Sequence, residues 1–226
     1  MKSTLAVFLS LFAAVTAANE PADASGVLVQ GSLRAAQVDT DTPPDLREAI
    51  IFFRPAAAVA VEPGVDAEMR MADKAFTPGV LAVTRGTQVR FPNTDPILHN
   101  AFSTSPQARF DLGFYGAGEA REQLFDAPGL IRVYCNVHHG MVGYVMVLDT
   151  PFFTQPDTNG KFSLMLPPDA TGTVYVWHPQ ADALQQAFTV NANAALDFAV
   201  NFTGRRLPRH LNKHGRRYDQ RTQRQY

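Results

Sequence analysis

Residues 134–141 read Tyr-Cys-Asn-Val-His-His-Gly-Met, and this stretch governs how the rest of the chain is interpreted. A thiol, an imidazole and a thioether (Cys135, His138 and Met141) stand three residues apart, between two apolar runs that favour strands. Soft sulfur ligands combined with imidazole select copper, and two histidines, one cysteine and a weak axial methionine form the blue-copper ligand set. The stretch is one imidazole short of that set, so a second histidine must come from elsewhere.

The N-terminus has the features of a secretory signal peptide. One positive charge, Lys2, precedes an apolar run over residues 5–14, and small residues follow as far as Ala18. The apolar run is shorter than the roughly 20 residues that span a bilayer. We therefore predict a signal peptide over residues 1–18, cleavage, and a periplasmic protein without a membrane span.

Cys135 is the single cysteine of the chain. An exported protein with one cysteine cannot form an internal disulfide, so this thiol is left over. Burial, pairing with another chain or metal binding would each account for it. The neighbouring His138 and Met141 favour metal binding.

Short apolar and alternating segments predict an all-β protein. The predicted strands cover residues 27–33, 49–53, 68–72, 80–84, 88–91, 129–135, 142–148, 161–166, 171–177, 186–190 and 196–202. Residues 103–119 are expected to be irregular because they are rich in glycine, proline and aromatic residues. Only residues 181–186 carry a pattern that could form a helix.

The segment before the Cys135 stretch resembles the first half of a cupredoxin, the fold of plastocyanin and amicyanin. Three motifs carry the likeness: Lys-Ala-Phe-Thr-Pro-Gly at 74–79, Val-Thr-Arg-Gly-Thr-Gln-Val-Arg-Phe-Pro-Asn-Thr-Asp at 83–95, and His-Asn-Ala-Phe at 99–102. The Cys-x-x-His-x-x-Met spacing at 135–141 resembles the ligand loop of that family. The resemblance covers residues 63–150 and implies a Greek-key β-sandwich.

The resemblance also implies a ligand set for one type 1 copper ion. His99 would supply the buried imidazole, Cys135 the thiolate, His138 the imidazole nearest the surface, and Met141 the long axial bond. Asn100 would hydrogen-bond to the Cys135 loop and hold the two ligand segments together.

Two alternatives remain open within this ligand set. Many cupredoxins have proline after the loop histidine, whereas this chain has His139, which could compete with His138 as the ligand. Met146 could likewise compete with Met141 for the axial position, although its place inside the following strand favours a role in the core.

The C-terminal half resembles a different β-sandwich, the carboxypeptidase regulatory-like or transthyretin-like domain. Residues 158–168 and 174–178 carry that likeness, and its opening strands resemble residues 29–31 and 49–53 rather than anything directly upstream. We therefore predict a discontinuous second sandwich, with the cupredoxin inserted into it. The corresponding division is 19–62 for N-terminal strands, 63–150 for the cupredoxin domain and 151–203 for C-terminal strands. Proteins with this layout include methylamine-utilisation-like periplasmic proteins.

Charge is unevenly distributed along the chain. Residues 204–226 contain eight cations against one anion, a net charge of +7, and are predicted to be a disordered tail. The mature body before this tail has eleven cations and twenty anions, a net charge of −9. The tail could guide electrostatic docking to a charged redox partner.

The sequence therefore predicts a periplasmic electron-transfer protein with one type 1 copper ion and a redox partner protein of unspecified identity. Alternatives are a copper carrier or sensor, or a scaffold module without redox turnover. Nucleic acid is not an expected partner. We expect no enzyme, because multicopper oxidase chemistry needs paired His-x-His motifs that this sequence lacks.

Overall fold

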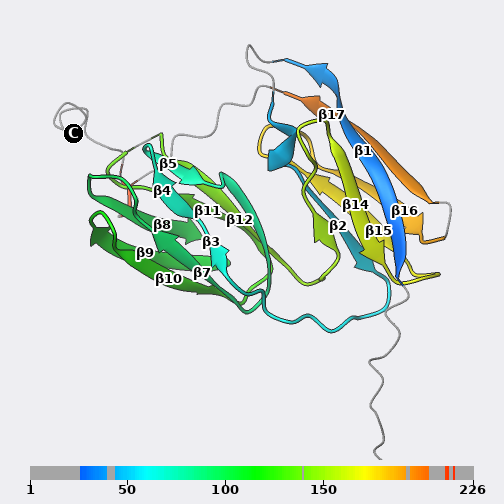
Figure 1. Ribbon diagram of the computed structural model, residues 1–226, viewed down its shortest axis with the longest axis horizontal. Helices are drawn as coiled ribbons and strands as arrows, with labels where there is room; N and C mark the ends of the chain where they lie inside the picture. Colours follow the sequence, from blue (N-terminus) through cyan, green and yellow to red (C-terminus); the bar gives the residue numbers. More distant parts are fainter. Residues whose placement is uncertain are drawn as a thin grey trace, which may run out of the picture.

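The computed structural model describes residues 26–39, 44–138, 140–191, 194–203, 212–213 and 216. The predicted signal peptide, His139 and most of the basic tail lie outside these residues. Figure 1 shows two β-sandwiches side by side, and a single 3-10 turn, η1 (Leu46–Glu48), is the helical element of the described part. The prediction of an all-β protein is confirmed. None of the described residues belongs to a helix long and apolar enough to cross a membrane.

We call the first unit the central sandwich. Its larger sheet has the order β6-β12-β11-β8-β9, and the facing sheet has the order β10-β7-β3, with β4 and β5 as a separate hairpin. The strands are β3 (Ala67–Glu68), β4 (Arg70–Ala72), β5 (Ala75–Thr77), β6 (Val80–Thr84), β7 (Thr87–Pro92), β8 (His99–Ser105), β9 (Ala108–Tyr115), β10 (Ala120–Phe125), β11 (Gly129–Tyr134) and β12 (Val142–Leu148).

The second unit, which we call the split sandwich, is built from both ends of the chain. Its sheets have the orders β14-β1-β17 and β13-β2-β15-β16. The strands are β1 (Val27–Val38), β2 (Ile50–Pro55), β13 (Phe153–Thr154), β14 (Lys161–Leu166), β15 (Thr171–Trp177), β16 (Leu184–Thr189) and β17 (Ala195–Phe202). β1 pairs with β14 and β17, and β2 pairs with β13 and β15. These are the pairings that an inserted central sandwich requires.

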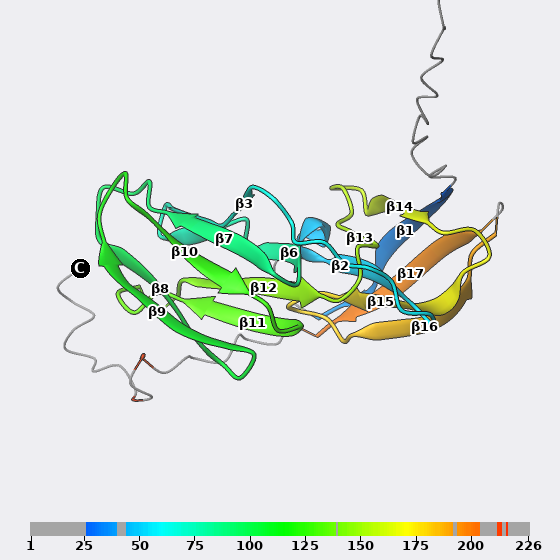
Figure 2. The same cartoon turned by 90° about the horizontal axis from the view of Figure 1, so that it is seen from below.

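Two strands, β2 and β12, are buried on both faces. One face of each strand packs in the core of its own sandwich, and the other face packs against the neighbouring sandwich. Val145 and Val147 of β12 point into the central core, whereas Tyr144, Met146 and Leu148 belong to a separate apolar cluster. Ile50 and Phe52 of β2 complete that cluster from the other side. A continuous apolar run such as β12 is typical of a strand buried on both faces. The two units, which Figure 2 shows side by side from a second direction, therefore share a third, interfacial core.

Several strand predictions are confirmed to the residue, namely 80–84, 142–148, 161–166 and 171–177. Two expectations are wrong. Residues 103–119 form the end of β8, all of β9 and a turn after each of these strands. The sequence hides this because β9 lies at the sheet edge, where its half-exposed side chains obscure the alternation. Residues 181–186 form a bridge at Ala181 and the start of β16 rather than a helix.

His178 is buried in the split sandwich and links its segments. Its ring is 1% exposed, and Nε2 lies 3.1 Å from the carbonyl oxygen of Asp45. The backbone N–H of Gln180 donates to Nδ1 at 3.1 Å. Since Nδ1 accepts a hydrogen bond, Nε2 must carry the proton, and the neutral ring is fully satisfied.

Stability should therefore fall as the pH drops below about 6.5. Burial lowers the pKa of His178 from 6.5, more than its contact with Asp45 raises it, so the unfolded chain binds this proton first. The loss should reach up to about 1.4 kcal/mol for each pH unit. Denaturant unfolding at pH 7.5 and 5.5 should show a shallower pH dependence for His178→Asn than for the wild type. Equal pH dependence of the two proteins would contradict this expectation.

Candidate metal centre

Three side chains at one end of the central sandwich form a compact donor group. Nδ1 of His99 and Nδ1 of His138 lie 3.1 Å apart, and Sγ of Cys135 lies 3.6 Å from the first and 3.8 Å from the second. A point equidistant from three atoms with these separations lies about 2 Å from each, which is the length of a metal–nitrogen bond. His99 and Cys135 are buried, and His138 is half-buried. The donor set and its spacing fit a copper ion.

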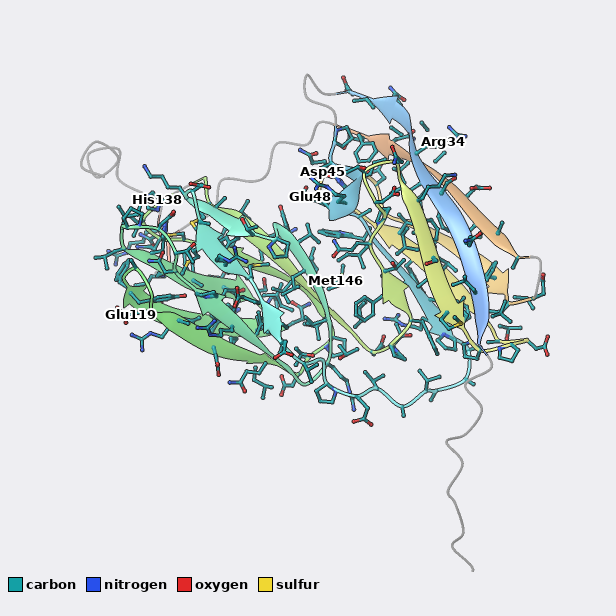
Figure 3. The ribbon with its side chains drawn as sticks, viewed as in Figure 1. Arg34, Asp45, Glu48, Glu119, His138 and Met146 are labelled. Carbon is teal, nitrogen blue, oxygen red and sulfur yellow. The ribbon has the colours of Figure 1, made fainter. Side chains whose placement is uncertain are left out.

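The fold brings these donors together from two places in the sequence. His99 is the first residue of β8, Cys135 follows the last residue of β11, and β8 and β11 are neighbours in the large sheet. A tight loop returns the chain to β12, because the N–H of Met141 donates to the carbonyl of His138 at 2.9 Å. Figure 3 shows His138 at the end of the central sandwich that faces away from the split sandwich.

Asn100 joins the two ligand segments. Its Oδ1 accepts a hydrogen bond from the backbone N–H of Asn136 at 2.7 Å, and its Nδ2 donates to Asp111 at 3.2 Å. Asn100 follows His99, and Asn136 follows Cys135. The contact therefore links the residues next to two donors, and this geometry suits the bridging role expected for Asn100.

Asp95 was not predicted as part of the site, yet it holds His99. Its Oδ2 lies 2.7 Å from Nε2 of His99. Its two oxygens also accept the backbone N–H groups of Asp73 (2.7 Å) and Lys74 (2.9 Å). Burial alone would raise the pKa of Asp95, but these hydrogen bonds, those from Lys74 and His99 foremost, lower it below its usual value. An ionised Asp95 holds a proton on Nε2 of His99, so Nδ1 is the nitrogen that would bind a metal once its own proton is lost.

Asp95→Asn should weaken copper binding about 10- to 100-fold. The two carboxylate oxygens accept hydrogen bonds from three N–H groups. In asparagine one of these oxygens is replaced by an NH₂ group, which would face at least one of the donors without being able to accept its hydrogen bond. Competition with a chelator of known affinity measures the change. Asp126→Asn, the same substitution at an exposed site, should bind copper as the wild type does. Equal affinity of both variants would show that Asp95 does not position His99.

The surroundings of Cys135 favour a thiolate. Burial alone would raise its pKa, but hydrogen bonds from His99 and from the backbone of Asn100, His138 and Val137 lower the pKa below the usual value of a thiol. The pKa of His99 is raised by Cys135 and Asp95, against the opposing effect of its burial. The thiolate is the form that binds metals.

The structure separates the two methionines that competed for the axial position. Met141 is 2% exposed and belongs to the same buried cluster as Cys135. Met146 lies in the interfacial core, toward the split sandwich and away from His138 (Figure 3). This placement leaves Met141 as the candidate axial ligand, which stays a prediction. His139 lies outside the described residues, so the choice between it and His138 also stays a prediction.

No protein-family model matches this sequence, and a search of curated proteins finds no significant relative. Solved structures similar to the chain include a purple cupredoxin from Nitrosopumilus maritimus, at 25% identity over 37% of this chain and 100% of that one, with a TM-score of 0.34. A reduced form of an amicyanin mutant is 22% identical over 43% of this chain and 98% of that one, with a TM-score of 0.35. Because the TM-scores are low, we assign no residue role from these likenesses.

A third similar structure corrects one prediction. The copper-containing nitrite reductase of Thermus scotoductus is 30% identical over 42% of this chain and 25% of that one, with a TM-score of 0.36. That protein is an enzyme, so the match contradicts the prediction that this chain is not one. The sequence argument was wrong because it considered only multicopper oxidases, and the lack of His-x-His pairs excludes no other enzyme.

Proposed function

We propose that this chain is a periplasmic electron-transfer protein that binds one copper ion through His99, Cys135, His138 and Met141. The observation that carries the proposal is the triangle of one sulfur and two imidazole nitrogens, each within 3.8 Å of the others. Buried type 1 sites use this donor combination. A copper ion held there would supply one-electron chemistry.

The residues around the donors suit electron transfer because they limit rearrangement. His99 is fixed by Asp95, and the Cys135 loop is fixed by Asn100. His138 alone of the three donors is not fully buried, so its ring edge is the natural point of approach for a redox protein. The partner would dock at this end of the central sandwich, away from the split sandwich.

Copper loading followed by redox titration tests this function. We expect one copper per chain and an intense visible band from thiolate-to-copper charge transfer. Ascorbate should bleach the band by reducing copper(II), and hexacyanoferrate(III) should restore it by oxidising copper(I). Copper binding without colour would favour the carrier or sensor alternative. Absence of copper binding would leave a scaffold module.

The proposal includes the division and location of the chain. We infer a signal peptide over residues 1–18, a cupredoxin domain over 63–150, and a split carboxypeptidase regulatory-like sandwich formed by 19–62 and 151–203. Support comes from the pairing of β1 and β2 with β14, β15 and β17. The resemblance to methylamine-utilisation-like proteins adds no substrate. Export should be visible as a periplasmic product that lacks its first 18 residues.

A further inference from the structure

A buried acid lies directly behind the donor group. Asp95 is 8% exposed, and its Oδ2 lies 2.7 Å from Nε2 of His99. The other ring nitrogen of His99, Nδ1, lies 3.6 Å from Sγ of Cys135. The backbone N–H groups of Asp73 and Lys74 donate to the two oxygens of Asp95 at 2.7 and 2.9 Å. Hydrogen bonds to both oxygens favour the ionised carboxylate, so a negative charge lies one imidazole ring away from the candidate metal position.

Asn93 fixes the backbone that carries Asp95. It is fully buried, and its Oδ1 accepts a hydrogen bond from the N–H of Asp95 at 3.0 Å. Its Nδ2 donates to the carbonyl oxygens of Ile97 at 2.8 Å and Tyr115 at 3.0 Å. These bonds join the loop before β8 to the end of β9. Because its backbone and its carboxylate are both bonded in place, Asp95 is a fixed charge that cannot turn toward solvent without breaking several hydrogen bonds.

The buried charges match a divalent ion. Cys135 brings one negative charge as the thiolate and Asp95 brings a second, whereas histidines bind metals as neutral imidazoles. Among the residues that the structure describes, His99 is the only side chain within ion-pair distance of Asp95. A divalent ion would therefore neutralise the group, and a monovalent ion would leave one negative charge uncompensated. Burying an uncompensated charge is costly, so the group should hold a divalent ion more tightly than a monovalent one.

We propose that Asp95 sets the redox preference of the metal centre, because its fixed charge stabilises copper(II) relative to copper(I) and lowers the reduction potential of the site. The exchange is a single electron between copper and the docked redox protein. Asp95 and His99 keep their shared proton in both oxidation states, so no bond forms or breaks. The reduced protein is then a stronger electron donor than the same site without the carboxylate. The redox preference rests on the proposed function, but the match to a divalent ion does not.

Separate measurements of the copper(II) and copper(I) affinities test the redox preference. Asp95→Asn should lower the copper(II) affinity about 10- to 100-fold and the copper(I) affinity much less. Each tenfold change in the ratio of the two affinities raises the reduction potential by about 59 mV, and a redox titration of the visible band measures that shift independently. Asp126→Asn, the exposed control, should keep the wild-type potential. Equal losses of both affinities in Asp95→Asn would mean that Asp95 only positions His99 and would overturn the redox role.

Asp95→Glu separates the charge of this residue from its position. Glutamate keeps the negative charge on a longer side chain, so both affinities can fall while the reduction potential stays close to that of the wild type. A potential equal to that of Asp95→Asn would overturn the role of the charge.

Zinc(II) and silver(I) test the match to a divalent ion without any electron transfer. Isothermal titration should show that Asp95→Asn lowers the affinity for zinc(II) at least about tenfold more than the affinity for silver(I). Losses of equal size would overturn the match. If no copper-loaded protein shows a visible band, the proposed function and the redox preference both fail, and the zinc and silver affinities still decide the charge match.

Discussion

Replacing Cys135 with serine should abolish the visible band of the copper-loaded protein. The band arises from charge transfer between a thiolate and copper, and Cys135 is the only cysteine in the chain. A hydroxyl is far less acidic than a thiol whose pKa is already lowered by hydrogen bonds, so serine offers no anionic ligand. Copper affinity should fall by more than about 100-fold, because mutating a residue that only hydrogen-bonds to a metal ligand already lowers metal affinity 10- to 100-fold. Absorption spectra and a chelator competition measure the two effects.

A remote histidine provides the control for this experiment. His178→Asn removes an imidazole from the split sandwich, and at pH 7.5 the variant should keep the full visible band. Near-ultraviolet circular dichroism of metal-free Cys135→Ser should match that of the wild type, since the substitution changes one atom in a packed core. A coloured Cys135→Ser protein would show that the thiolate is not the ligand.

The donor group could be predicted because local spacing places most of it. Cys135, His138 and Met141 occupy one short loop, and the likeness to cupredoxins pointed to His99 as the missing imidazole. β12 was predicted to the residue because a run buried on both faces is apolar throughout. At such positions the local sequence is enough to predict where a residue lies in the fold.

Contacts between distant segments could not be predicted in this way. Asp95 stands in a loop of turn-forming residues, and only its position four residues before His99 hints at a role. Its function also depends on the N–H groups of Asp73 and Lys74, which a separate hairpin supplies. Lys213 is one cation among eight in the tail, and nothing in its sequence neighbourhood distinguishes it. Nζ of Lys213 lies 2.7 Å from Oδ2 of Asp111, and this ion pair between residues 102 positions apart follows from the folded shape alone.

The interfacial core was also not predicted, and Met146 is its most informative residue. Met146 was considered as an axial ligand or as part of a domain core, but it is 8% exposed and packs between the two sandwiches. Tyr144 and Trp177 meet there with ring centroids 5.5 Å apart. Because both sandwiches contribute to this core, we expect them to unfold together in the wild-type protein.

Met146→Lys should separate the two unfolding events. A lysine at this position would be buried among apolar side chains, and an unpaired buried charge costs about 3 kcal/mol or more. The penalty falls on the contact between the sandwiches, since the neighbouring Val145 and Val147 face the central core on the other side of β12. Calorimetry should therefore show two transitions at lower temperature in place of one. The visible band of copper-loaded Met146→Lys should persist at room temperature. On heating, it should disappear in the transition that unfolds the central sandwich and stay unchanged in the other transition.

Met165→Lys is the matched control, because Met165 is 56% exposed on β14. The same substitution on an exposed surface should change the free energy of unfolding by no more than about 0.5 kcal/mol. Equal melting curves for the two variants would show that the sandwiches do not share a core. Two transitions in Met146→Lys alone would show that the split sandwich stabilises the central sandwich. The interface would then make an inserted domain and a sandwich assembled from both ends of the chain into one cooperative unit.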